Sequence, residues 1–554
     1  MAALYQWQFL HPHTVTSFDQ FRQVILDNRH WQEKDLSLHL KLENLTAADL
    51  KISQTALTAA HQRLQRAVDN QQKVLIFGDY DADGNCATAI MWQGLRAFGL
   101  DSTPFIPDRL RHGYGMSVVA LQEIFTQQKP DLIITVDNGI TAWEALEYCQ
   151  QEGVDVIVTD HHQAESNRTP QVNACVHTTL LSGAGVAWFL IFSLLQQQQS
   201  ATALSTATSL LDLVALATIV DQVPLIGINR QLVKLGLEEL RHSQRVGIQA
   251  LAIAANLKQE SLSTRDIGFG LGPCINAVGR LSGSLDALRL LCTQKPALAR
   301  QLAQGLCGLN SSRQTLTREQ LDLAHAQLDP ENLSPLLIVD SQEFHDGIIG
   351  LIASKLVDEF HRPSIVFAQG DTLAKGSARS IPGFDITTFI RQFKPMLVSC
   401  GGHSQAAGLS CLPEKFANLK AAMLDAATQQ IKPEQLIPHL TLECQCDLEV
   451  INHPELPTLI TALEPFGPGN QPLQVAVCGQ VLSVQTLGAE GSHLKITLKQ
   501  KGEVLACLCW RYQDQLESIP AVSQKITLAG TLETNTFRGR TSMQLIFNDW
   551  QASK

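Results

Sequence analysis

The sequence lacks an excess of positive charge. Its 554 residues include 42 Lys and Arg against 53 Asp and Glu, which gives a net charge of −11 at pH 7 and a pI of about 5.9. Proteins that coat nucleic acid without discrimination are usually basic. Any binding of nucleic acid by this chain must therefore use local patches, and bound cations would neutralise part of its acidity.

The sequence also lacks the marks of a zinc-binding, secreted or membrane protein. Its thirteen cysteines include no Cys-x-x-Cys pair, and the pairs Cys444/Cys446 and Cys507/Cys509 have a spacing that is more often structural. The first residues show no basic segment followed by an apolar one. The longest apolar stretch, near residues 183–195, is too short to span a bilayer. We therefore expect reduced thiols, no membrane segment and a cytoplasmic location.

One stretch organises the rest of the chain. A short apolar run, residues 74–77, is followed by carboxylates at alternate positions, Asp79, Asp81 and Asp83. Side chains two residues apart lie on one side of an extended segment, so we expect the three to converge before a helix over residues 87–98. Converging like charges repel, and a divalent cation turns the repulsion into binding. A solvated acidic loop is the alternative, but the position after a buried strand favours a metal site.

Alternating strands and helices predict an α/β fold with a doubly wound, mostly parallel sheet. Residues 227–328 have a predominantly helical pattern, and a second α/β unit begins near residue 335. About five short strands after residue 441 indicate a small barrel such as an OB-fold. The predicted segments are an N-terminal segment 1–45, a catalytic sheet domain 46–235, a helical spacer 236–330, a smaller α/β domain 331–435 and a C-terminal β-barrel 436–554.

Acidic residues and histidines follow several apolar runs, so four distant segments can supply metal ligands. We predict five ligands, namely Asp81, Asp83, Asp137, His161 and Asp221. Oxygen-rich sites with an imidazole suit Mn²⁺ or Mg²⁺. Five ligands are too many for one ion that keeps open positions, so two ions are expected, with Asp137 shared between them. Taken singly, Asp137-Asn-Gly is usually a turn, and Asp221 could merely cap one.

Three further residues lie close to the predicted ligands. Asp79 is part of the acidic stretch, and Asp160 could orient the imidazole of His161. His162 could face a phosphate of the substrate or protonate its leaving oxygen. A His-His pair taken alone is as often structural as catalytic. We assign Asp79, Asp160 and His162, together with Arg280, to catalysis.

Basic residues outside this cluster are candidates for holding phosphate. Arg109, Arg111 and Tyr114 lie on a Gly-containing loop that could hold a phosphate and a base, although an ordinary charged surface loop is the alternative. Arg280 follows a glycine in a locally uncharged stretch that also contains Asn276, and it needs an anionic partner. That partner is a substrate phosphate in our interpretation, and a core carboxylate in the alternative. We also assign Asn276 to substrate binding.

The second half of the chain offers possible contacts for a nucleic-acid strand. Two Gly-rich segments, residues 375–384 and 401–408, resemble cradles for a phosphate backbone. The tail interleaves aromatics with arginines, as a non-sequence-specific single-strand groove requires, although aromatics can also simply cover a small barrel. The predicted contacts are Ser377, Arg379, Gly402 and His403 in the first two segments and Trp510 and Arg538 in the tail.

These residues carry a resemblance to a known family. Residues 79–84, 136–139, 159–162 and 220–224 resemble the four motifs of the DHH phosphoesterases, and residues 401–408 resemble the signature of their DHHA1 domain. With the barrel-like tail, roughly residues 45–550 resemble the bacterial exonucleases of this family. The resemblance implies a Mn²⁺- or Mg²⁺-dependent 5′→3′ exonuclease on single-stranded DNA in repair and recombination. It also implies a monomer that works with single-strand binding protein and a RecQ-type helicase.

Two other functions are compatible with parts of the pattern. One is an enzyme of the same superfamily that acts on short RNA oligonucleotides, cyclic dinucleotides or pyrophosphate, but such substrates need no barrel of about a hundred residues. The other is a non-catalytic replication scaffold on the same fold, but degenerate relatives lose metal ligands and the set here is intact. We therefore expect the exonuclease.

Overall fold

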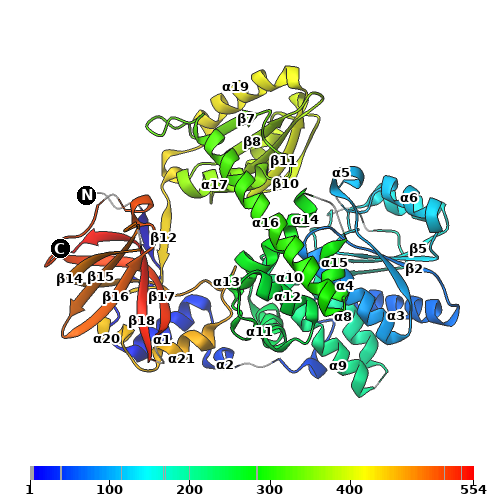
Figure 1. The fold of residues 1–554 in the computed structure, drawn as a ribbon, viewed down its shortest axis with the longest axis horizontal. Coiled ribbons are helices and arrows are strands. Elements are labelled where there is room, and N and C mark those ends of the chain that lie inside the picture. Colours follow the sequence, from blue (N-terminus) through cyan, green and yellow to red (C-terminus); the bar gives the residue numbers. More distant parts are fainter. Residues whose placement is uncertain are drawn as a thin grey trace. The chain divides into compact units, whose positions relative to one another are not determined.

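The computed structural model describes residues 5–553 except 38–39, 114, 166–167, 169, 199, 282–284, 489, 517 and 538–539. The chain divides into two compact units, and Figure 1 labels their helices and strands. The first contains Leu38–Arg313 and Glu464–Gln471, and the second contains Met1–Ser37, Gln314–Leu463 and Pro472–Lys554.

A five-stranded parallel sheet forms the centre of the first unit. Its strand order is β3-β2-β4-β5-β6, with bounds β2 (Val74–Phe77), β3 (Ser102–Phe105), β4 (Leu132–Val136), β5 (Asp155–Asp160) and β6 (Ala174–His177). The chain leaves β2 toward β3 on one side and then places β4 on the other. The strand order therefore reverses between β2 and β4, which is where open α/β sheets bind ligands.

Both faces of this sheet are covered by helices, so its strands are apolar on both sides. Leu132, Ile134 and Val136 of β4 belong to a core shared with α3 (Gln54–Asp69), α4 (Ala82–Phe98) and α8 (Gly183–Gln196). Ile133 points the other way, into a smaller core with α6 (Val118–Gln128) and α7 (Trp143–Gln151). The alternation of side chains along one strand thus divides the unit into two apolar layers.

Helices complete the first unit, and the helical pattern predicted for residues 227–328 is confirmed. They are α9 (Ala201–Ser209), α10 (Leu211–Val220), α11 (Gly227–His242), α12 (Val246–Ala254), α13 (Thr264–Asp266), α14 (Gly272–Leu281) and α15 (Asp286–Cys292), with a π-helical turn over Ile267–Leu271. The stretch Thr202–Val220 is long and apolar enough to cross a membrane, yet 67% of it is buried inside the fold. It is therefore a core element of this unit. The long helix α16 (Pro296–His325) begins here and ends in the second unit.

The second unit contains a mixed sheet of order β10-β11-β9-β8-β7. Its strands are β7 (Leu337–Ser341), β8 (Ser364–Gln369), β9 (Ala374–Arg379), β10 (Ser399–His403) and β11 (Ala406–Cys411), and its main helices are α17 (Ile349–Phe360), α18 (Ile386–Arg391) and α19 (Pro413–Gln430). The Gly-rich loop predicted at residues 401–408 is wrong, because β10 and β11 form a hairpin there. A Cβ on Gly402 would lie 2.3 Å from the carbonyl oxygen of Ala406, so this glycine serves close strand pairing.

A closed barrel follows in the same unit and confirms the OB-fold prediction. Strands β14 (Gln474–Leu487), β15 (His493–Gln500), β16 (Glu503–Cys509), β18 (Arg540–Ala552) and β17 (Lys525–Phe537) pair in that order, and β17 pairs with β14. The N-terminal strand β1 (Gln6–Phe9) pairs with β12 (His439–Leu442). Asn28 and Arg29, at the end of α1 (Phe18–Arg29), contact the carboxylate of Glu443. The first residues of the chain are thus part of this unit.

Candidate metal centre

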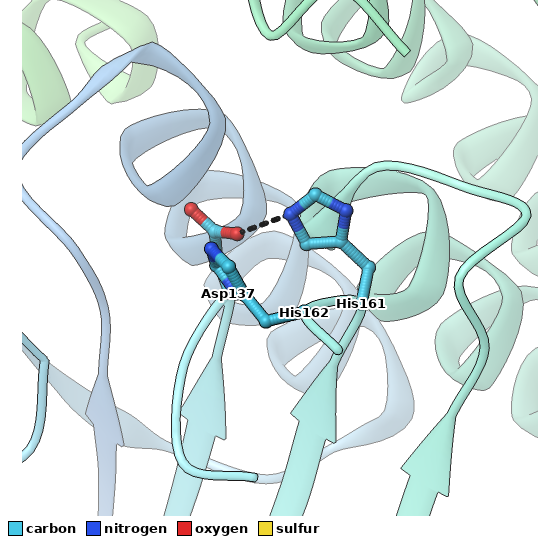
Figure 2. Close-up of side chains that lie close together, drawn as sticks. All are labelled: Asp137, His161 and His162. Atoms are coloured by element: carbon cyan, nitrogen blue, oxygen red, sulfur yellow. Dashed lines mark ion pairs between the residues drawn. The ribbon is translucent and has the colours of Figure 1, made fainter. Parts of the chain in front are cut away.

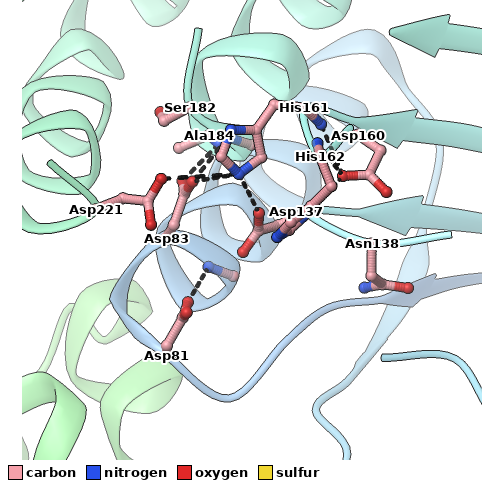
Figure 3. A network of polar contacts seen from close by, with 12 residues as sticks. Asp81, Asp83, Asp137, Asn138, Asp160, His161, His162, Ser182, Ala184 and Asp221 are labelled. Atoms are coloured by element: carbon pink, nitrogen blue, oxygen red, sulfur yellow. Dashed lines mark hydrogen bonds and ion pairs between the residues drawn. The ribbon is translucent and has the colours of Figure 1, made fainter. Parts of the chain in front are cut away.

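The acidic residues and histidines gather at the carboxyl edge of the parallel sheet. Figure 3 shows side chains from four chain-distant segments gathered there. The segments are the start of α4, the turn after β4, the end of β5 and the end of α10, and the residues are Asp81, Asp83, Asp137, Asp160, His161, His162 and Asp221. The edge between β2 and β4 is also the point where the strand order reverses. The fold itself therefore brings these chain-distant residues together.

The acidic stretch reaches this edge in a different conformation from the one predicted. Helix α4 begins at Ala82 instead of residue 87, so Asp81 is its N-cap and Asp83 lies in its first turn. The Asp81 carboxylate accepts a hydrogen bond from the Gly84 amide at 3.0 Å. The expectation of three carboxylates along one extended segment is therefore wrong, because the capping preference of aspartate starts the helix early.

Asp83 is held by the beginning of another helix. Its two carboxylate oxygens accept hydrogen bonds from the backbone amides of Gly183 and Ala184, each at 2.7 Å. Both donors belong to the first turn of α8, where free amides and the helix dipole favour negative charge. Asp83 is 2% exposed. The two amide hydrogen bonds therefore replace the hydrogen bonds to water that the carboxylate loses on burial.

Asp137 follows β4 with a left-handed backbone, φ +63°. The next side chain, Asn138, donates from Nδ2 to the carbonyl oxygens of Phe77, Gly78 and Val136. It thereby joins the ends of β2 and β4 and fixes the turn that presents Asp137. The Asp137 Oδ1 atom is buried and accepts no hydrogen bond within the described part of the chain. A buried carboxylate oxygen of this kind calls for a cation.

His161 lies at the centre of the cluster. Its Nε2 atom is 3.1 Å from Asp137 Oδ1 (Figure 2), 3.6 Å from Asp83 Oδ2 and 3.7 Å from Asp221 Oδ2. Potential ligand atoms fall into two groups, each within 4.8 Å, and the groups share His161. They are Asp137, His161 and His162, and Asp83, His161 and Asp221. Carboxylate oxygens with imidazole nitrogens form a donor set that fits Mn²⁺ or Mg²⁺.

Asp160 contacts a different histidine from the one expected. Its Oδ1 atom lies 2.8 Å from Nδ1 of His162, and it also accepts the backbone amides of His161 and His162. The prediction that Asp160 orients the ring of His161 is therefore wrong, since residues 160 and 162 face the same side at the end of β5. The second Asp160 oxygen accepts the Ile140 amide at 2.9 Å.

Burial and mutual repulsion perturb the carboxyl groups strongly. Burial, together with the charge of Asp81, raises the pKa of Asp79 to about 8. Burial and the charge of Asp83 raise the pKa of Asp221 to about 8. Burial also raises the pKa of Asp137 well above its ordinary value, with Asp83 and Asp81 adding to the effect. Without a cation, Asp79 and Asp221 therefore hold protons near neutral pH.

The His162–Asp160 pair shows the opposite effect. Burial would lower the pKa of His162, but the hydrogen bond and charge of Asp160 prevail and raise it to about 9. Burial would raise the pKa of Asp160, yet the bonds from His162 and the Ile140 amide hold it below its usual range. The imidazole is therefore protonated at neutral pH, so a positive proton donor lies at the edge of the acidic cluster.

Helix α14 supports the acidic stretch from outside the sheet. The Asn276 Oδ1 atom accepts the Ala82 amide at 2.8 Å. A Cβ on Gly279 would lie 2.7 Å from the ring of Tyr80, so α14 packs directly on the segment between Asp79 and Asp81. Arg280 belongs to the same helix, but its side chain lies outside the described part of the structure.

The predicted loop for phosphate is in part a short helix, α5 (Arg109–His112). Arg111 is exposed there and forms an ion pair with Glu123 at 2.8 Å, an arrangement that matches the alternative of a charged surface segment. The side chain of Arg109 and the whole of Tyr114 lie outside the described residues.

In the second unit, Ser377 and Arg379 lie on the same side of β9, and an Arg379 guanidinium nitrogen is 3.2 Å from the Ser377 hydroxyl. Burial lowers the pKa of Arg379. A Cβ on Gly350, in the first turn of α17, would lie 3.1 Å from the Arg379 guanidinium, so the helix begins against it. A partly buried guanidinium and a helix N-terminus both favour an anion.

The remaining predicted contacts are on the surface of the second unit. Gly402 and His403 are exposed on β10. Trp510 is 45% exposed, and its ring meets His493 edge-on at 5.0 Å between centroids. Arg538 lies outside the described residues.

Sequence reasoning missed the residues that hold the ligands in place. Asn138 and the Gly183–Ala184 amides touch the cluster, yet neither was assigned to it. The segment Ser182-Gly-Ala-Gly did carry a signal, because Ser182 is an N-cap whose hydroxyl accepts the Gly185 amide. A capped helix start beside a strand end indicates an anion site. The partner of those amides, about a hundred residues earlier, follows only from the fold.

Comparisons with known proteins agree with this architecture. The model of the DHH family, N-terminal domain, matches residues 73–218. The model of the DHHA1 domain matches residues 333–430. The model of the RecJ OB domain matches residues 442–549. All four strand- and helix-ending segments of the candidate centre lie within or directly beside the first match.

Several curated proteins named single-stranded-DNA-specific exonuclease RecJ are similar along most of the chain. The protein of Bacillus subtilis is 33% identical over 508 residues, which cover 89% of this chain and 63% of that protein. The protein of Haemophilus influenzae is 32% identical over 512 residues, covering 87% of this chain and 88% of that one. The chain thus spans less than two thirds of the Bacillus protein but most of the Haemophilus one.

Solved structures match in the same way. Thermus thermophilus RecJ in complex with Mn²⁺ is 29% identical, with a TM-score of 0.82 over 99% of this chain and 80% of that one. The Mg²⁺ complex of the same protein gives a TM-score of 0.78 over 99% and 79% of the two chains, at 28% identity. An exonuclease RecJ bound to manganese is 35% identical over 72% of this chain and 97% of that one, with a TM-score of 0.61.

Proposed function

The chain belongs to the RecJ family of single-stranded-DNA-specific exonucleases, and we propose that it degrades single-stranded DNA by metal-dependent phosphodiester hydrolysis. One observation supports this most strongly. Two buried carboxylates, Asp83 and Asp137, and the more exposed carboxylate of Asp221 surround the Nε2 atom of His161 within 3.7 Å. Such a cluster is unstable as bare charges and is suited to divalent cations beside a phosphate.

We propose two ions, Mn²⁺ or Mg²⁺, held by Asp81, Asp83, Asp137, His161 and Asp221. When bound, they would supply a nucleophilic water and neutralise charge on the phosphoryl group. The sequence suggested Asp137 as the shared ligand, and its buried Oδ1 atom, which faces His161 Nε2 at 3.1 Å, is available for a cation. His161 belongs to both candidate groups and could serve either ion. Asp79, which accepts the Tyr80 amide at 2.7 Å, lies beside the ligands and adds to the negative charge.

The protein's own groups would handle the proton and the charge of the leaving group. His162, kept protonated by Asp160, is the candidate to donate a proton to the leaving oxygen or to bind a phosphate oxygen. Arg280 remains the proposed cation for developing negative charge, since its helix packs on the acidic stretch. Asn276 would act by positioning Ala82 between Asp81 and Asp83.

Contacts with the strand are proposed in each unit separately. The proposed contacts are Arg109 and Tyr114 in the first unit and Ser377, Arg379, Gly402, His403, Trp510 and Arg538 in the second. Asn276 and Arg111 are not among them, because their side chains bond to Ala82 and Glu123. The domain division into residues 46–235, 236–330, 331–435 and 436–554 belongs to the same proposal. So do the 5′→3′ direction, a cytoplasmic monomer acting in DNA repair and recombination, and collaboration with single-strand binding protein and a RecQ-type helicase.

A digestion assay on the purified chain tests the function. Single strands labelled separately at each end, a blunt duplex and a dinucleotide are incubated with Mn²⁺ or Mg²⁺. We expect the long single strand to be digested from its 5′ end and the duplex to resist. EDTA, or Asp137→Ala, should abolish digestion. Digestion that persists in either case would refute the metal mechanism, and a preference for the dinucleotide would assign the chain to the small-substrate branch of the superfamily.

A further inference from the structure

Two cysteines of the first unit lie almost within bonding distance. The Sγ atoms of Cys274 on α14 and Cys307 on α16 are 3.2 Å apart. A disulfide needs about 2.05 Å between its sulfur atoms, so the two thiols would have to close by only about 1 Å. The pair plays no part in the proposed hydrolysis, and its proximity needs another explanation.

The two thiols differ in access and in chemistry. Cys274 is buried, whereas Cys307 is partly exposed at the margin of the core. The hydrogen bond between them lowers the pKa of Cys307, against the effect of burial. The same bond and burial raise the pKa of Cys274. A thiolate is the form of cysteine that reacts with an oxidant, and a lowered pKa favours it. Cys307 is therefore suited to react first, and Cys274 to form the disulfide in a second step.

Two polar side chains of α16 act on Cys274. Asn310, one turn after Cys307, donates from Nδ2 to the Cys274 sulfur at 3.7 Å. The charge of Arg313, one turn further, also acts on Cys274. Both oppose the rise of the Cys274 pKa, so they favour negative charge on this sulfur when it attacks a sulfenic acid on Cys307.

We propose that Cys274 and Cys307 form a reversible disulfide when the protein meets hydrogen peroxide. The Cys307 thiolate attacks one peroxide oxygen, the O–O bond breaks, and the leaving hydroxide takes up a proton as water, which leaves a sulfenic acid on Cys307. The Cys274 sulfur then attacks the Cys307 sulfur, the S–O bond breaks, and hydroxide leaves as a second water with the proton of Cys274. The two thiols are oxidised by two electrons, and the peroxide is reduced by two.

The disulfide would act on the metal centre through α14. This helix carries Asn276, which holds the Ala82 amide, and Gly279, which packs on Tyr80. Drawing Cys274 toward α16 moves a residue only two positions before Asn276. This step depends on the proposed metal site, and we expect the oxidised protein to bind Mn²⁺ about 10-fold more weakly, as when a supporting contact of a metal ligand is lost.

Peptide mapping tests the disulfide without any need for nuclease activity. The full chain is reduced, desalted, treated with hydrogen peroxide, unfolded, alkylated and cleaved after Arg and Lys. Cys274 is then the single cysteine of residues 266–280, and Cys307 is that of residues 301–313. We expect these two peptides to be cross-linked, and dithiothreitol to separate them. The buried pair Cys444 and Cys446 is the internal control. Peroxide should not oxidise these thiols, so both should be alkylated after unfolding. Failure to recover the cross-link, or oxidation of Cys307 beyond the sulfenic acid instead, overturns the proposal.

A matched variant tests the coupling to the metal centre. Cys307→Ser removes the attacking thiol. In this variant, peroxide treatment should change neither the alkylation of Cys274 nor the Mn²⁺ affinity measured by calorimetry. Wild type should lose affinity on oxidation and regain it with dithiothreitol. If the cross-linked wild type binds Mn²⁺ as tightly as the reduced protein, the coupling is refuted, whatever the DNA assay shows.

Discussion

Gly183 leaves no room for a side chain beside Asp137. A Cβ on Gly183 would lie 2.5 Å from both the Cβ and the Oδ1 of Asp137. The Gly183 amide also donates to Asp83 at 2.7 Å. Gly183 therefore contacts two proposed ligands from different segments. Glycine is required here because there is no room for a Cβ, and not because the backbone is left-handed.

Gly183→Ala should abolish metal-dependent digestion while leaving every proposed ligand in the sequence. The added methyl group must displace Asp137 or the start of α8, and we expect a loss of activity of more than about 100-fold with weaker Mn²⁺ binding by calorimetry. Gly305→Ala is the control, since a Cβ there meets nothing within 4 Å. It lies inside α16 and should stabilise the protein by roughly 0.5–1 kcal/mol without changing activity. Full activity of Gly183→Ala would show that Asp137 tolerates displacement.

Asp137→Asn should separate function from stability. The backbone at residue 137 has φ +63°, which asparagine tolerates well, so the variant should fold. It removes a buried acid whose pKa is raised by burial and by Asp83 and Asp81. We expect the metal-free variant to melt at or above the wild-type temperature, and its activity to fall by more than about 100-fold. Added Mg²⁺ should raise the melting temperature of wild type more than that of the variant, and an equal rise would contradict a ligand role for Asp137.

Strand ends could be located from the sequence because their pattern is local. The apolar run before Asp137 and the run before Asp160 define β4 and β5, and parallel strands necessarily end at one edge. The contact of Gly183 with Asp83 spans a hundred residues, and no local pattern contains it. The start of α4 at Ala82 was missed because strand periodicity and helix capping give competing readings of the same aspartates.

The roles of individual polar side chains were the least predictable part. Asn276 was read as a substrate contact, yet its carbonyl oxygen accepts the Ala82 amide. Arg111 was read as a phosphate ligand, yet it pairs with Glu123. The partners of both side chains are distant in the sequence, and the packing of apolar residues brings their helices and strands together. Composition and spacing therefore predict which residue types lie at the sheet edge, but the hydrogen-bond partner of each side chain depends on the packing.

The metal-free protein should become less stable as pH rises across neutrality. Burial and neighbouring charges raise the pKa of Asp79 and of Asp221 to about 8 in the folded chain, against about 4 when unfolded. The folded state therefore holds these protons more tightly, and the resulting stability is complete below about pH 4 and lost as pH rises through about 8. Asp221→Asn removes one such group.

Urea unfolding without metal, at intervals between about pH 5 and about pH 9, measures this effect. Wild type should lose stability relative to Asp221→Asn as pH rises. Saturating Mg²⁺ should reverse the trend for wild type, because the ion binds the deprotonated carboxylates and its binding releases protons. A stability difference that is independent of pH would mean that Asp221 is ionised in the metal-free fold.

Asn276 supports the acidic stretch by accepting one hydrogen bond, and two substitutions separate that role from contact with substrate. Asn276→Ala leaves the Ala82 amide without its acceptor between Asp81 and Asp83, so we expect Mn²⁺ affinity to fall by about 10- to 100-fold. Asn276→Asp keeps an acceptor at the same place and should retain metal binding. Calorimetric titration of both variants with Mn²⁺, in the absence of DNA, gives the comparison. If both bind Mn²⁺ like wild type and only the KM for single strands rises, the residue acts on the substrate, because a positioning residue must change metal affinity before any DNA is present.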